Sequence, residues 1–89
     1  SNKIDDRIIS YSVNSKEILN SKFSIIDAIE KLKLIESRSE IKRLINSNGI
    51  RINDEKYNFH DFSLSSYSNL NEIKITIGKK KIGIIKILK

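Results

Sequence analysis

Residues 37–53 read SRSEIKRLINSNGIRIN, a basic helical stretch that ends at a glycine and runs directly into a strand pattern. Ser37 and Glu40 have the spacing of a capping box, in which the serine hydroxyl accepts from the third helical N–H and the glutamate carboxylate accepts from the cap N–H. At about 100° per residue, one face of this helix is apolar and the other is polar. The apolar face holds Ile41, Leu44 and Ile45, and the other face holds Arg38, Lys42, Arg43 and Asn46.

The same stretch predicts the end of the helix and a hairpin after it. Asn48-Gly49 fits a left-handed helix end, which we expect at the glycine because it has no Cβ to make a positive φ costly. Ile50-Arg51-Ile52 alternates with the period of a strand, and Asn53-Asp54 then supplies turn residues. The helix should therefore lead into a short hairpin.

The rest of the chain predicts a second helix and two further strands. Ser24 and Asp27 repeat the capping spacing before an apolar stripe that continues to about Leu34. Residues 73–77 alternate isoleucine with polar residues, and the apolar pattern resumes after Gly78. Residues 59–71 are rich in serine and asparagine and predict an irregular loop.

Residues 1–22 carry little pattern, so we expect a tether with one helical turn near residues 15–19. The remaining residues, 23–89, form the predicted domain. The order of its elements predicts an α+β fold, with two helices packed on a small, mainly antiparallel four-stranded sheet.

The charge pattern favours a polyanionic partner. The chain has 17 Lys and Arg against 11 Asp and Glu, a formal net charge of +6, and residues 79–89 hold five lysines and no acid. The absence of cysteine excludes disulfides and thiol chemistry. No apolar run is long enough to span a bilayer, so we expect no membrane partner. The missing cysteines leave the compartment unconstrained but compatible with the cytoplasmic location that we expect.

The sequence does not indicate a catalytic or a metal-binding function. His60 is the only histidine and has no metal-ligand spacing around it. The adjacent carboxylates Asp54 and Glu55 point apart, which disfavours acid-base catalysis. The sparse aromatic residues are more typical of a core than of base stacking; they include Tyr57, Phe59, Phe62 and Tyr67. We predict no catalytic residue, metal site or cofactor in this chain.

The order and motifs of these elements resemble the S-four-like RNA-binding module, in particular the C-terminal module of bacterial-type tyrosyl-tRNA synthetases. That family runs roughly Ser-Lys-Ser-Glu-Ala-Arg-Arg-Leu-Ile, then Gly-Val, Val-Asn-Gly-Glu and a late Gly-Lys-Lys-Lys strand. This chain matches it at residues 37–45, 49–50, 52–55 and 78–81, within a resemblance that covers about residues 23–88. It departs by Ile41 for alanine, Lys42 for arginine and Asp54 for the turn glycine.

The resemblance implies a tRNA-binding appendage of tyrosine-tRNA ligase that holds the anticodon and long variable arms of the tyrosine tRNA. A separate catalytic domain would use ATP and magnesium and form a homodimer, whereas the isolated module would be an inactive monomer. The expected RNA-binding residues are Ser37, Arg38, Lys42, Arg43, Asn46, Lys79, Lys80 and Lys81.

Other interpretations stay open from sequence. A basic helix face is usually only solvated, and lysines 79–81 would also serve to block edge-strand pairing. The module also occurs in pseudouridine synthases and ribosome-associated factors. A protein-interaction domain with a basic surface is the alternative from another class.

Overall fold

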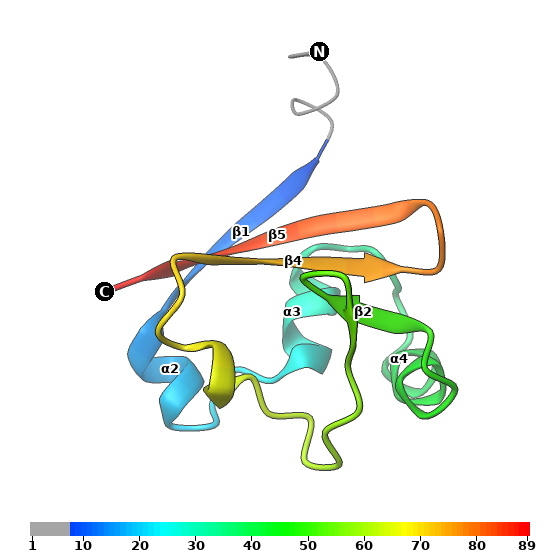
Figure 1. Cartoon of the computed structure of the whole chain (residues 1–89), viewed down its shortest axis with the longest axis horizontal. Helices are drawn as coiled ribbons and strands as arrows, with labels where there is room; N and C mark the ends of the chain where they lie inside the picture. Colours follow the sequence, from blue (N-terminus) through cyan, green and yellow to red (C-terminus); the bar gives the residue numbers. More distant parts are fainter. Residues whose placement is uncertain (1–7) are drawn as a thin grey trace.

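The computed structural model describes residues 8–89, which form an α+β domain with three α-helices, a short 3-10 helix and a five-stranded sheet (Figure 1). The α+β class is confirmed, but the predicted number of strands was wrong, because a strand precedes the first helix. The elements are β1 Ile9–Asn14, α2 Ser15–Leu19, α3 Ile25–Lys31, α4 Arg38–Asn46, β2 Ile50–Ile52, β3 Glu55–Lys56, η1 Ser65–Tyr67, β4 Glu72–Ile77 and β5 Lys81–Leu88.

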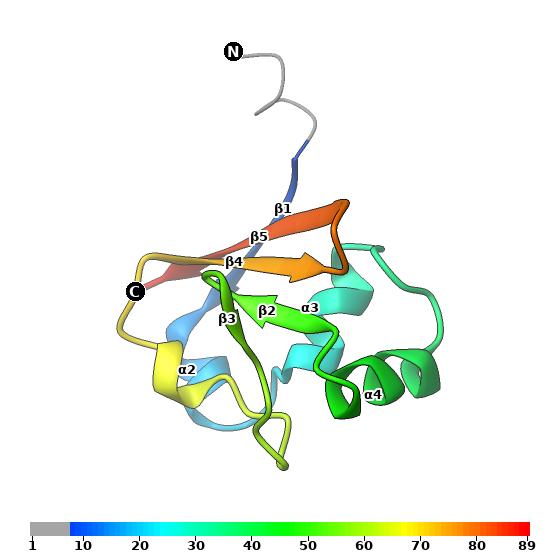
Figure 2. The same ribbon diagram turned by 45° about the vertical axis from the view of Figure 1, so that its right-hand side comes forward.

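The sheet is mixed, in the order β1-β5-β4-β2-β3. Strand β1 pairs with β5 in parallel, while the other neighbouring strands are antiparallel. All the helices lie on one side of the sheet (Figures 1 and 2). The inward side chains of β4 and β5 alternate along each strand and are buried against the helices; they include Ile73, Ile75, Ile77, Ile85 and Ile87.

The prediction of a tether over residues 1–22 was wrong for the part that the structure describes. Val13 in β1 and Ile18 in α2 are buried in the same core as the other helices. The Asn14 side chain accepts a hydrogen bond from the Lys16 N–H and caps α2 directly after the strand. The predicted helical turn at residues 15–19 is present, and residues 1–7 lie outside the described residues.

The end of α4 forms, but with a different residue in the left-handed conformation. Asn48 has φ 63°, while Gly49 stays outside that region. The Gly49 N–H donates to the Leu44 carbonyl at 2.7 Å and the Asn48 N–H to the Ile45 carbonyl at 3.1 Å, the two bonds of a Schellman motif. Asparagine tolerates positive φ, and a Cβ on Gly49 would lie 3.1 Å from the Leu44 side chain. Close packing, rather than φ, explains the glycine.

The predicted hairpin is present as β2 and β3. Asn53 and Asp54 at its turn have φ 52° and 73°. Positive φ at both central residues is the geometry of a type I′ turn, which asparagine and aspartate accept. Asp54 therefore replaces the family's turn glycine without loss of the hairpin.

Candidate nucleic-acid interface

Ser37 is the N-cap of helix α4, as its capping spacing predicts. The Ser37 Oγ accepts from the Glu40 N–H at 3.3 Å and lies 2.9 Å from the Ser39 Oγ. The Glu40 carboxylate pairs with Arg43 Nη2 at 2.7 Å instead of closing the capping box. The cap therefore stabilises the helix start through the serine alone.

The two faces of α4 separate largely as the helical pattern predicts. Ile41 and Ile45 are buried in the core, while Lys42, Arg43 and Asn46 are exposed. Leu44, which we expected to be buried, is only half-buried and packs at the edge of the core. Helix α4 thus presents a polar, cationic side to solvent.

The lysine turn, defined here as residues 78–81 at the junction of β4 and β5, lies beside the end of α3 and the loop that leads to α4 (Figure 2). The Gly78 N–H donates to the Gly49 carbonyl at 3.1 Å, just after the end of α4. The Lys81 Nζ donates to the Leu34 carbonyl at 3.1 Å, in the loop before α4. Gly78 has φ 61°, a conformation that favours glycine at this position.

A shallow hollow joins the lysine turn to the start of α4. Its lining includes Ser37 and Lys81, two predicted site residues, together with Glu40 and Lys33. Lys33 is not among the predicted site residues, because it falls inside the stretch predicted as a helix to about Leu34. Glu36 also lines the hollow, so its two lysines stand beside two carboxylates, and the hollow itself carries no excess of positive charge.

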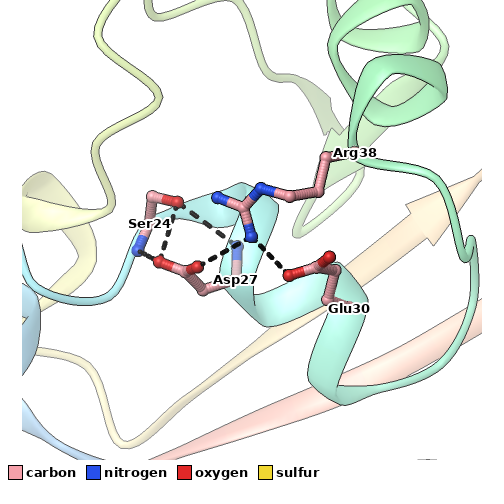
Figure 3. Close-up of polar contacts among 4 residues, drawn as sticks. All are labelled: Ser24, Asp27, Glu30 and Arg38. Carbon is pink, nitrogen blue, oxygen red and sulfur yellow. Dashed lines mark hydrogen bonds and ion pairs between the residues drawn. The ribbon is translucent and has the colours of Figure 1, made fainter.

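Arg38 differs from the other predicted site residues, because its guanidinium turns back onto α3 (Figure 3). Its Nη1 lies 3.3 Å from the Asp27 carboxylate and also pairs with the Glu30 carboxylate. The hydrogen bond with Asp27 raises the pKa of Arg38, with Glu30 adding to the effect. Arg38 links the two helices, so it is less available to a phosphate than the prediction assumed.

Asp27 belongs at the same time to the capping box of α3. Its carboxylate accepts from the Ser24 N–H at 2.9 Å, while its own N–H donates to the Ser24 Oγ at 3.2 Å. Partial burial raises the pKa of Asp27, but the hydrogen bonds from Ser24 and the contact with Arg38 outweigh it. The pKa of Asp27 is therefore below its ordinary value of 3.8.

Replacing Asp27 with alanine should lower the free energy of unfolding by about 1 kcal/mol at neutral pH, through loss of the capping box and the exposed ion pair. Because the folded state lowers the pKa of Asp27, this stabilisation is present above pH 3.8 and is lost as the pH falls through the folded pKa. We would measure the free energy of unfolding of variant and parent in urea at pH 7 and at pH 3. The two proteins should differ less in this free energy at pH 3 than at pH 7. A constant difference would contradict the assigned role of the carboxylate.

Within residues 8–89, no three His, Asp or Glu side chains gather in a group that could hold a metal ion. No helix in that part of the chain is long and apolar enough to cross a membrane.

Comparison with curated proteins finds similarity to tyrosine-tRNA ligases. The chain is 36% identical over 81 residues to the tyrosine-tRNA ligase of Pelagibacter ubique, which covers 90% of this chain and 20% of that protein. It is 37% identical over 65 residues to that of Borrelia turicatae, covering 72% of this chain and 16% of the relative. It is 30% identical over 88 residues to that of Orientia tsutsugamushi, covering 98% of this chain and 21% of the relative.

No family model matches the chain. The matches to curated proteins nevertheless cover most of it and confirm the predicted resemblance. The chain spans about a fifth or less of the length of these relatives (20%, 16% and 21%).

Proposed function

Because the chain is related to one part of the tyrosine-tRNA ligases, we propose that it is the tRNA-binding domain of such an enzyme, with an S-four-like fold. The domain docks the anticodon and long variable arms of the tyrosine tRNA. Aminoacylation takes place in a catalytic domain outside this chain, which uses ATP and magnesium and forms the homodimer. The fragment alone is an inactive monomer, and the enzyme acts in the cytoplasm.

The observation that supports this proposal is that the lysine turn contacts the segments on both sides of α4, at Leu34 before the helix and at Gly49 after it. These contacts gather the cations of two distant segments at one end of the domain. Among residues 8–89, no carboxylate lies within 4.0 Å of the ammonium groups of Lys42, Lys79 or Lys80. These charges are free to meet phosphates.

The chemistry of this surface suits the shape of structured RNA. A-form RNA hides the base edges of its deep groove, so proteins grip phosphates and hydroxyls instead. Arg43 can form a fork of two hydrogen bonds to a phosphate once it leaves Glu40, whereas Lys42 and the lysine turn act as point charges. Ser37 and Asn46 add neutral hydrogen-bonding groups at the two ends of the helix.

Binding of tRNA should depend steeply on salt. Five cations on this surface, Lys42, Arg43 and the three lysines of the turn, give a slope of log affinity against log salt of roughly −4.5 at about 0.9 per phosphate contact. The affinity should then fall about 500-fold between about 50 and 200 mM salt. Fluorescence anisotropy with labelled tRNA measures this, and an acidic protein of similar net charge serves as the competitor. Absence of tRNA binding at low salt would overturn the proposal, as would a preference for the acidic protein.

A further inference from the structure

A second hollow lies at the other end of the polar side of α4, away from its cap. It is open to solvent, has a volume of about 130 Å³, and is lined by polar and aromatic side chains that include Asn46, Asn48, Asn58, Phe59, His60 and Phe62. Of these residues, only Asn46 belongs to the predicted RNA-binding set.

Phe59 presents a fixed aromatic ring at this hollow. It packs edge-to-face on Tyr57 with 5.1 Å between ring centroids, and on Tyr67 with 6.3 Å. The interpretation of Phe59 as a core residue was wrong, since it remains 41% exposed, while Tyr57 is fully buried. Phe59 is therefore held in place by the core and partly open to a ligand.

The loop that carries these side chains is tied to the domain. Phe62 has φ 58°, a left-handed conformation that a bulky residue adopts only under strain. Its carbonyl accepts from the Ile25 N–H at 3.0 Å, and its N–H donates to the Phe59 carbonyl at 3.2 Å. The backbone of α3 thus fixes the loop, and with it the wall of the hollow.

The polar wall can recognise the edge of a base. Asn46, Asn48 and Asn58 are exposed, and each amide offers both donors and an acceptor, as do nucleobase edges. Lys42 lies one helical turn before Asn46, so a phosphate held by Lys42 would lie next to the hollow. Unpaired bases are the part of RNA that proteins commonly stack on aromatic rings.

We propose that this hollow binds one unpaired nucleobase of the bound RNA, stacked on Phe59 and hydrogen-bonded by the asparagine amides. The proposal rests on the RNA-binding function proposed above and adds a base contact to its phosphate contacts. A base contact predicts a preference for RNA with an unpaired loop over a blunt duplex of equal charge.

The test compares a hairpin RNA, with 2-aminopurine at successive loop positions, against a blunt duplex of the same phosphate number. Phe59→Leu keeps an apolar side chain but removes the ring, so it should weaken hairpin binding about tenfold. It should leave duplex binding and the salt slope unchanged, because no phosphate contact is lost. Binding of the parent chain should also change the fluorescence of 2-aminopurine at one loop position more than at the others. Leu70→Ala, an exposed apolar residue outside the hollow, is the control.

Asn58→Ala provides a second variant, since Asn58 is exposed and the loss of its amide should not unfold the domain. It should weaken hairpin binding without altering duplex binding. If the parent binds hairpin and duplex equally and both variants bind like the parent, the base site is refuted while the RNA-binding function stands. If the parent binds neither RNA, the function fails, and the base site with it.

Discussion

Changing Lys79, Lys80 and Lys81 together to glutamate is expected to weaken tRNA binding about 100-fold at low salt. The three side chains are exposed on the turn, which contacts the segments before and after α4. At about 1 kcal/mol for each charged contact, their loss removes about 3 kcal/mol of binding free energy, or about 100-fold. The salt slope should fall by about three, one for each phosphate contact.

A second set of charge reversals tests whether α4 itself binds RNA. Lys42 and Arg43 changed to glutamate should also weaken binding and lower the slope by about two. Arg38 is left out of this set, because a glutamate there would face the carboxylates of Asp27 and Glu30 and destabilise the contact between α3 and α4.

The control set for charge reversal is Lys16, Lys22 and Lys86, which are exposed outside α4 and the lysine turn. It changes the net charge as much as the lysine-turn set does. Equal weakening by the control set would mean that net charge alone drives binding. If only the lysine-turn variants weaken tRNA binding, the polar face of α4 is merely solvated. If neither set of variants weakens tRNA binding, the RNA-binding function is refuted. Melting curves show first that every variant folds.

The features predicted from sequence are those set by neighbouring residues. The caps at Ser24 and Ser37 and the turn at Asn53-Asp54 each depend on contacts within a few positions. The buried stripe of α4 arises from helical periodicity in the same way. Such local preferences can be recognised without knowing the rest of the fold.

The features that sequence analysis missed depend on partners far along the chain. Strand β1 pairs with β5, more than seventy positions away, by the register Ile9↔Gly83 to Asn14↔Leu88. Residues 9–14, Ile-Ser-Tyr-Ser-Val-Asn, do alternate as a strand does. This pattern is too short to distinguish a strand from a tether without knowledge of its partner β5. Arg38 likewise meets carboxylates eight and eleven positions earlier, which no helical wheel of α4 displays.

Replacing Val13 with aspartate provides the sharpest test of this missed strand. Val13 is 4% exposed and lies opposite Ile87 of β5. An aspartate there would bury an unpaired charge, which should cost at least about 3 kcal/mol of unfolding free energy. For a domain of this size, 1 kcal/mol shifts the melting temperature by about 4–8 °C, so melting should fall by about 12–24 °C.

Ser12→Asp is the matched control, because Ser12 is the preceding residue of β1 and its side chain is exposed. Both variants place an aspartate in the same strand, so the intrinsic cost of aspartate in a strand largely cancels between them. The remaining difference is burial, because successive side chains of a strand point to opposite faces of the sheet. Thermal unfolding followed by circular dichroism should find Ser12→Asp within about 0.5 kcal/mol of the parent. If the two variants melt together near the parent, residues 9–14 do not dock on β5, and the tether inferred from sequence describes them better than the strand does.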